Sequence, residues 1–193
     1  MLKEKDGDKM KIEKERKYIF ADPTAPLNLI VKAKTRSLIF QWYLNEGDRI
    51  RLEISSGKFL WTRNLKTEID DQSRYEEEVS LNPSDVDFNR LFTHPMVVKN
   101  RYFLEYDPEI IIDEILNPAG MIKYNMPQTG EKLFLTEIEE KDTFVKDLSE
   151  FMNRFFANRI LIDVTGLKKY KNSEIAGLCM DHFLKLFYEV IRG

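Results

Sequence analysis

The amino-acid sequence predicts an α+β fold, in which about eight antiparallel strands form a sheet closed into a β-barrel and helices pack on its outside. Two observations favour this fold. The strand-like segments come in two groups, and each group is followed by a helix-like segment. Most of the strands have one apolar side and one side that bears Arg, Lys, Glu or Asp. Closed on itself, such a sheet could hold one small ligand inside, with its apolar side outward beneath the helices.

The first predicted strand, residues 11–20, is unusual because neither of its faces is apolar. Its second half, Tyr18-Ile19-Phe20, is aromatic and β-branched, which is typical of a strand. Side chains alternate across a strand, so Glu13, Glu15 and Lys17 share one face. A solvated edge strand would explain this segment taken alone, because charge on an edge strand discourages aggregation.

The remaining elements follow from apolar patterns and turn residues. A short helix starts near Asp22-Pro23 and runs to about residue 34. Asn82-Pro83 favours the start of a second helix over residues 84–93. Further helices are predicted over residues 142–156 and 172–191. Strands are predicted at residues 37–44, 49–54, 58–66, 74–81, 97–103, 109–116, 132–140 and 160–166.

The composition limits the function classes. The chain has 193 residues, of which 42% are hydrophobic and 33% charged, so we expect a disordered charged tail over residues 1–9 and one domain over residues 10–193. The net charge of −3 disfavours a general nucleic-acid or membrane-surface binder. One cysteine and two histidines disfavour disulfides and His/Cys zinc chemistry. The lack of a signal peptide or long apolar run predicts a cytoplasmic protein, for which a homodimer is left open.

The charges on the predicted strands come as same-sign residues two positions apart. Antiparallel strands usually turn their charged side to water, and random charges would need no other explanation. Neighbouring like charges on one face repel and do not stabilise a sheet, so a shared ligand explains them better. The pairs are Glu13/Glu15, Arg49/Arg51, Glu76/Glu78, Lys99/Arg101 and Glu137/Glu139.

Glu13-x-Glu15-x-Lys17 resembles the N-terminal Glu-x-Glu-x-Lys signature of the CYTH superfamily, the triphosphate tunnel metalloenzymes. Further segments resemble the family's motifs in the family's order. They are Gln41-Trp42-Tyr43-Leu44, Arg49-x-Arg51, Arg74-x-Glu76-x-Glu78, Lys99-x-Arg101-Tyr102, Asp113, Glu137-x-Glu139, and Asp163-Val164-Thr165 with Lys168-Lys169-Tyr170-Lys171-Asn172.

Three positions depart from the family's pattern. Trp42 stands where the family has glycine, and Asp163 stands where it has Glu. The family's Thr-x-Lys strand is replaced by Thr62-Arg63-Asn64-Leu65-Lys66, in which either Arg63 or Lys66 could take the place of the lysine.

The resemblance implies an eight-stranded antiparallel tunnel that hydrolyses a linear triphosphate, its small-molecule partner, with Mg²⁺ or Mn²⁺ as cofactor. Guanidinium groups bind phosphate oxygens bidentately, and hard divalent cations take carboxylate ligands. The implied phosphate-binding residues are Lys17, Arg49, Arg51, Arg63, Lys66, Arg74, Lys99, Arg101 and Lys169. The implied metal ligands or residues that orient them are Glu13, Glu15, Glu76, Glu78, Asp113, Glu137 and Glu139. The implied catalytic residues are Glu13, Glu15, Lys17, Glu137 and Glu139.

Two other functions stay open on the sequence. A class IV adenylyl cyclase has the same tunnel, but its upstream His-Phe pair is missing from Lys9-Met10-Lys11-Ile12. A non-catalytic module that binds a nucleotide or polyphosphate would keep the basic residues without needing all the carboxylates. The sequence does not distinguish inorganic triphosphate, thiamine triphosphate and nucleoside triphosphates, because these share the phosphate chain.

Overall fold

The computed structural model describes residues 11–69, 73–125, 132–140, 145–157 and 159–192. Within them, one large sheet has nine strands, all paired antiparallel. Its strands are β1 (Lys11–Phe20), β2 (Thr35–Asn45), β3 (Asp48–Ser55), β4 (Lys58–Glu68), β5 (Ser73–Ser80), β6 (Met96–Tyr106), β7 (Glu109–Leu116), β9 (Phe134–Glu139) and β10 (Leu161–Asp163). A small second sheet pairs β8 (Ile122–Lys123) with β11 (Leu178–Cys179).

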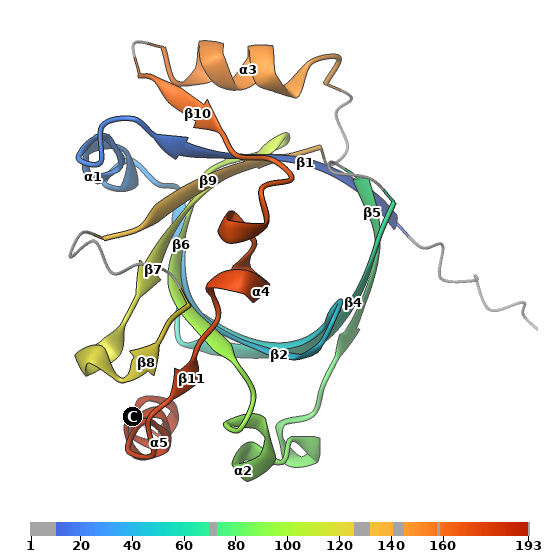
Figure 1. Ribbon diagram of the computed structural model, residues 1–193, viewed down its shortest axis with the longest axis vertical. Helices are drawn as coiled ribbons and strands as arrows, with labels where there is room; N and C mark the ends of the chain where they lie inside the picture. Colours follow the sequence, from blue (N-terminus) through green and yellow to red (C-terminus); the bar gives the residue numbers. More distant parts are fainter. Residues whose placement is uncertain (1–10, 70–72, 126–131, 141–144, 158, 193) are drawn as a thin grey trace, which may run out of the picture.

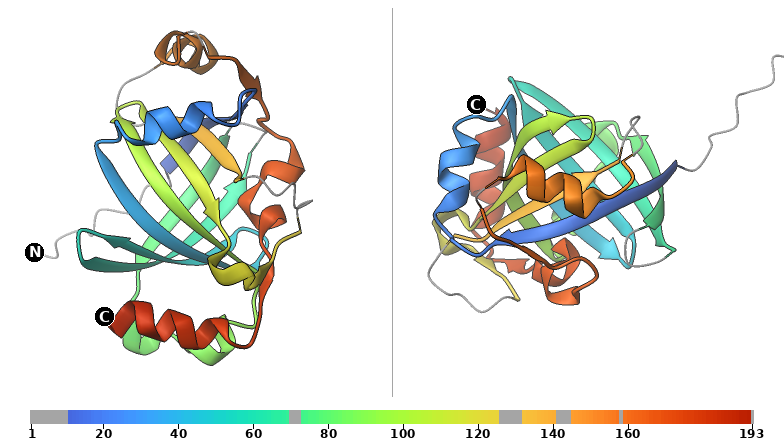
Figure 2. Two further views of the ribbon diagram at one scale, coloured as in Figure 1. Left: turned by 90° about the vertical axis from the view of Figure 1, so that its left-hand side faces the viewer. Right: turned by 90° about the horizontal axis from the view of Figure 1, so that it is seen from above.

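The helices lie mostly outside the large sheet, which curls around a central space (Figure 1). They are α1 (Ala25–Ile30), α2 (Phe88–Leu91), α3 (Leu148–Phe155), α4 (Asn172–Ile175) and α5 (Phe183–Arg192), with 3-10 turns η1 (Pro83–Asp85), η2 (Pro118–Gly120) and η3 (Lys168–Tyr170). Helices α3 and α5 lie at opposite ends of the longest axis, and α4 lies across one end of the central space (Figure 1, Figure 2). No helix in the described ranges is long and apolar enough to cross a membrane.

The predicted α+β class is confirmed, but the predicted closed barrel of eight strands is wrong. The sheet is open, and its nine strands follow the order β10-β1-β5-β4-β3-β2-β6-β7-β9. Residues 11–14 of β1 pair with β5, and residues 15–18 pair with β9. No described residue of β1 pairs with both β5 and β9. The two strands therefore contact successive segments of β1, and no continuous hydrogen-bonded ladder runs across all three. Strand β10, which pairs with residues 18–20, is the ninth member.

The outer face of the curled sheet is apolar, as the strand pattern predicts, and helices cover much of it. Phe40 and Trp42 of β2 and Trp61 of β4 are buried in a cluster with Phe183 and Phe187 of α5. The rings of Trp42 and Trp61 stack with centroids 5.9 Å apart. Burying each large apolar side chain contributes roughly 1.5–3 kcal/mol. This burial fixes the apolar side of the strands outward and therefore turns the charged side inward.

A second apolar cluster lies between the sheet and α3. Leu148 and Met152 of α3 are buried together with Phe20 of β1 and with Ile110 and Ile112 of β7. This cluster fixes the outward faces of β1 and β7. The residues that alternate with these apolar ones must therefore point into the central space.

The predicted helix over residues 172–191 is wrong, since three elements replace it: α4, β11 and α5. The backbone leaves the helix at Ala176, where ψ is 140°. Gly177 then exchanges two backbone hydrogen bonds of 2.9 and 3.0 Å with Met96, and residues 178–179 pair with β8. The amphipathic pattern does not reveal this interruption, because two-residue strands carry too few side chains to show a period.

Other predicted elements are shorter or divided. The helix expected over residues 84–93 becomes η1 and α2, capped by Asn82 and Asp87. Helices α1 and α3 and strand β10 are shorter than expected. The predicted tail over residues 1–9 and the first three residues of the helix predicted over 142–156 lie outside the described residues.

Two glycines with nearly equal backbone angles provide a test of the β2–β3 turn. Gly47 and Gly57 have φ of +75° and +74°. A Cβ on Gly47 would lie 2.2 Å from the carbonyl oxygen of Lys66, whereas one on Gly57 would meet no atom within 4 Å. Gly57→Ala should lower the free energy of unfolding by about 1–2 kcal/mol, the cost of the left-handed conformation. Gly47→Ala should lower it further, because β4 must also move. Equal losses in denaturant titrations would contradict this account of the turn.

Candidate functional site

The curled sheet encloses a cavity of about 1500 Å³ whose lining is dominated by charged side chains. The strands β1 to β7 and β9 supply most of the lining, and a segment that we call the strap, residues 164–174, lines one end. Among the described residues, the basic lining side chains are Lys17, Arg49, Arg51, Lys66, Arg101, Lys168 and Lys171. The acidic ones are Glu15, Glu46, Glu53, Glu76, Glu78, Glu109, Glu137, Glu139 and Glu174.

The cavity brings together ten of the residues that the sequence singles out, from strands far apart in the chain. These are Glu15, Lys17, Arg49, Arg51, Lys66, Glu76, Glu78, Arg101, Glu137 and Glu139. Four others do not line it: Arg63, Lys99, Asp113 and Lys169. The backbones of Glu13 and Arg74 pair with each other, but their side chains lie outside what the structure describes.

Strand β4 places Lys66 inside and Arg63 outside. Arg63 pairs across the sheet with Ile50 and Val79 on the apolar outer face, and its guanidinium binds the carboxylate of Asp48 at 2.7 and 2.9 Å. The ammonium of Lys66 lies 2.9 Å from the carboxylate of Glu76 within the cavity. Lys66 is therefore the residue of this hairpin that can reach an internal ligand, and Arg63 leaves the candidate set.

One charged network links four strands around Arg101. Asp113 accepts two hydrogen bonds from the Arg101 guanidinium, at 2.9 and 2.8 Å, and one from Lys99 at 2.5 Å. Glu137 lies 3.6 Å from Arg101 and 2.7 Å from the ammonium of Lys17. Burial would raise the pKa of Asp113 and of Glu137, but the neighbouring cations hold both pKa values below their ordinary range. Both carboxylates are therefore ionised and neutralise part of the basic wall.

A second network holds the opposite carboxylate pair. Glu76 contacts Arg49 at 3.1 Å and Lys66 at 2.9 Å. The buried amide of Asn64 donates to Glu76 at 2.9 Å and to Glu78 at 2.5 Å. Glu76 and Glu78 thus already accept hydrogen bonds from the protein. Their role is to orient the basic side chains beside them, such as Arg49 and Lys66.

Arg49 and Arg51 carry buried donors that no described residue satisfies. Neither Nε atom has a hydrogen-bond partner among the described residues, although buried donors are nearly always paired. Burial lowers the pKa of Arg51, and the positive charges of Arg101 and Arg49 lower it further. A bound anion in the cavity would offset this repulsion between the guanidinium groups.

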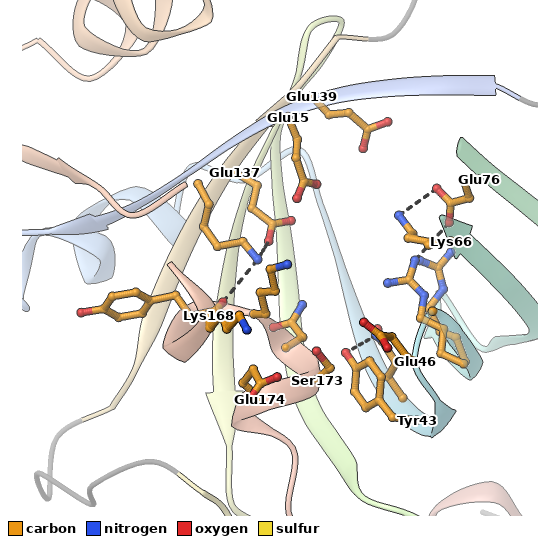
Figure 3. A pocket seen from close by; sticks show the side chains of 18 of the residues that line it. Glu15, Tyr43, Glu46, Lys66, Glu76, Glu137, Glu139, Lys168, Ser173 and Glu174 are labelled. Atoms are coloured by element: carbon orange, nitrogen blue, oxygen red, sulfur yellow. Dashed lines mark hydrogen bonds and ion pairs between the residues drawn. The ribbon is translucent and has the colours of Figure 1, made fainter. Parts of the chain in front are cut away.

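The carboxylates of β1 and β9 supply oxygen ligands of the kind that Mg²⁺ and Mn²⁺ prefer. Glu15 lies directly opposite Glu139 in the β1–β9 register, and Glu139 lies opposite Glu109 of β7. Figure 3 shows Glu15, Glu137 and Glu139 projecting from these neighbouring strands. The described residues contain no group of three or more His, Cys, Asp or Glu side chains arranged to hold a metal. The donors at this end of the cavity fit a divalent cation in kind, without a preassembled site.

The strap contributes lysines that the sequence reasoning missed. Lys168 and Lys171 line the cavity, whereas the ammonium of Lys169 lies over the ring of Tyr170 at 4.9 Å. Lys168 projects from the strap toward the cavity (Figure 3). The carbonyl of Tyr170 accepts a hydrogen bond from Lys17 at 3.4 Å, which ties the strap to β1. The basic run was visible in the sequence, but the 3-10 turn η3 decides which lysine faces inward.

Tyr43, which belongs to the segment Gln41-Trp42-Tyr43-Leu44, lines the cavity with its side chain (Figure 3). Its hydroxyl accepts a hydrogen bond from the Gln41 amide. Burial raises the pKa of Tyr43 above its usual value. The hydroxyl therefore stays protonated and can donate to an acceptor in the cavity.

Comparisons with known proteins give fold likenesses alone. No family model matches the chain, and no curated protein matches it. The PH1819 protein of Pyrococcus horikoshii OT3 is 19% identical, with 78% of this chain and 93% of that one covered, and a TM-score of 0.49. The inorganic triphosphatase NE1496 is 20% identical, with 85% and 93% covered, and a TM-score of 0.40.

A putative adenylyl cyclase from Hippeastrum, HpAC1, described as having a dominant triphosphatase activity, is 12% identical. The comparison covers 94% of this chain and 96% of that one, with a TM-score of 0.43. At these scores none of the likenesses bears on the activity of this chain.

The pKa of Lys99 gives a pH-dependent prediction. Burial, with the nearby charge of Arg101, lowers this pKa to about 8, from about 10.4 in an unfolded chain. Between these values the unfolded state binds more protons, so the contribution of Lys99 to folding stability rises with pH across this window. The difference in free energy of unfolding between the wild type and Lys99→Met should shift in favour of the wild type from pH 8 to 10. A constant difference, measured by denaturant titration, would contradict it.

Proposed function

We propose that this chain hydrolyses a linear triphosphate bound in the cavity, with Mg²⁺ or Mn²⁺ as cofactor. The observation that carries the proposal is the pair of guanidinium groups on Arg49 and Arg51, which line the cavity close enough to repel each other. Lys17, Lys66 and Arg101 line the same cavity. A chain of phosphates offers acceptor oxygens along its length and suits several such donors at once.

The charge of the cavity supports a cation in addition to the phosphates. Among the described lining residues, nine are acidic and seven are basic. A triphosphate alone would add several negative charges to a lining that is already acidic. Glu15 and Glu139, which face each other across β1 and β9, are the carboxylates that we assign to the cation. A divalent ion held there would offset phosphate charge and lower the pKa of a bound water.

The sequence motifs support the same proposal. The residues that carry the resemblance to the CYTH superfamily are spread from β1 to the strap, yet most of them line one cavity. A set of unrelated solvated strand faces would not converge in this way.

The roles of the chain's own residues follow from their positions. Arg49, Arg51 and Arg101 neutralise and orient the phosphates, and Lys66 adds a charge beside Glu76. Lys17 lies at the junction of β1, Glu137 and the strap. Water attacks a terminal phosphorus, the bond to the bridging oxygen breaks, and inorganic triphosphate yields orthophosphate and diphosphate. Positioning and charge neutralisation supply most of the catalysis in this type of reaction.

A non-catalytic triphosphate-binding module is the second candidate. It is favoured by two observations: the absence of a preassembled acidic trio among the described residues, and the engagement of Glu76 with basic side chains. Such a module would use the same arginines without turning over its ligand.

A direct test separates these functions. The purified protein is incubated with inorganic triphosphate, thiamine triphosphate or a nucleoside triphosphate, each with Mg²⁺, with Mn²⁺ or with excess chelator, and the products are separated. We expect orthophosphate and the matching diphosphate with metal only. Cyclic nucleotide would indicate a cyclase, and binding without any product would indicate the binding module. Neither binding nor turnover of any triphosphate would refute the proposal.

Glu15 should separate function from stability. Glu15→Gln removes a negative charge opposite Glu139, so hydrolysis should fall roughly 100-fold or more. The metal-free variant should be as stable as the wild type or more stable, because a like-charge repulsion is removed. Glu77→Gln, an exposed neighbour of Glu76 on the outward side of β5, is the control and should keep full activity. Full turnover by Glu15→Gln, or a much lower melting temperature, would count against this role.

Lys66 and Arg63 form a matched pair on opposite faces of β4. Lys66→Ala should weaken binding of the non-hydrolysable imido analogue of triphosphate about tenfold, the worth of a charge-assisted contact. Arg63→Ala should change binding less than about twofold, because the side chain is exposed on the outer face. Calorimetric titration in the presence of Mg²⁺ measures both. The reverse pattern would place Arg63 at the ligand.

A further inference from the structure

Two charged residues beside the cavity are too deeply buried to contact a ligand. The side chains of Lys99 and Asp113 are 1% and 0% exposed, and neither lines the cavity. Their partner Arg101 does line it, with its side chain 14% exposed. Burying charges in this way costs desolvation, and apolar residues would often be as stable in such a place. A role in stability alone is therefore a weak reason for this pair.

Asp113 holds the guanidinium of Arg101 by two hydrogen bonds. Asp113 Oδ1 accepts from Arg101 Nε at 2.9 Å, and Oδ2 accepts from Nη2 at 2.8 Å. This two-point contact fixes the plane of the guanidinium as well as its distance. The third nitrogen, Nη1, takes no part in this two-point contact, and the side chain of Arg101 lines the cavity.

The charges of Lys99 and Asp113 also set the net charge of the buried group that contains Arg101. A lone Arg101–Asp113 pair would be electrically neutral and would attract an anion weakly. Lys99 contacts the same Asp113 oxygen as Arg101 Nη2, at 2.5 Å. The group of three then carries two positive charges and one negative charge. Glu137, 3.6 Å from Arg101, is balanced by Lys17 at 2.7 Å, so one positive charge remains in excess, and in a buried setting it is poorly screened.

We propose that Lys99 and Asp113 are positioning residues for Arg101: Asp113 fixes its guanidinium toward the cavity, and Lys99 keeps the buried group net positive toward a bound triphosphate. The inference rests on the proposed function, because it takes the ligand to be a triphosphate. In this proposal Lys99 does not contact phosphate and Asp113 does not contact metal, whereas the family resemblance implies such contacts.

A double-mutant cycle tests the proposal. Binding of the imido analogue of triphosphate is measured by calorimetry with Mg²⁺ for the wild type, Asp113→Asn, Arg101→Ala and the double variant, and each is melted in parallel. Asp113→Asn alone should weaken binding about tenfold, since Arg101 loses its orientation. In the Arg101→Ala background the same change should alter binding less than about twofold, because no guanidinium remains to be positioned.

The Lys99→Met variant supplies the same cycle if Asp113→Asn does not fold. It should weaken binding in the wild-type background about tenfold and leave Arg101→Ala nearly unchanged. Equal weakening in both backgrounds by either substitution would overturn the positioning role, whatever the melting temperatures. A wild-type protein that does not bind the analogue would instead refute the proposed function, so the two failures are distinguishable.

Discussion

The two-residue period of the β-strand is the constraint on which this structure depends. Most strands of the curled sheet send apolar side chains outward, and clusters around Trp42 and Met152 bury many of these side chains beneath helices. The same alternation sends every second side chain inward. Many of those inward positions are charged, whereas Val97 and Leu135 pack inward against Ile175 of α4. Burial of the outward side chains holds the inward charges together against their mutual repulsion. The free energy that places the site therefore comes from the opposite face of the strands.

Inside the cavity, basic side chains lie close to one another, and neighbouring carboxylates neutralise only part of their charge. Asp113 and Glu137 offset the cations of one wall, and Glu76 offsets Arg49 on another. Two features of opposite sign are then left to explain: the mutual repulsion of Arg49, Arg51 and Arg101, and the position of Glu15 opposite a second glutamate. An anion accounts for the first and a cation for the second. A metal-bound triphosphate supplies both, which is why the proposed function unites them.

Much of the inward and outward assignment could be predicted from sequence, because alternation within one strand is local. Arg49 and Arg51 lie inward as their pattern predicts. The choice between Arg63 and Lys66 is open on the motif, but Arg63 shares the strand face of the outward Trp61 and Lys66 does not, so the same local pattern places Lys66 inward. The pairing of β1 with β9 and the break at Gly177 depend instead on contacts that are distant in the sequence. Such pairing leaves no signal in local periodicity.

The central claim is that the cavity recognises a chain of phosphates by a row of cations. Calorimetric titration of the Mg²⁺-loaded protein with orthophosphate, diphosphate and the imido analogue of triphosphate tests it most directly. The account predicts that affinity rises at each step of phosphate number and that replacing both Arg49 and Arg51 by Gln removes the gain. Equal affinity for orthophosphate and triphosphate, or a gain that survives in the double variant, would contradict it.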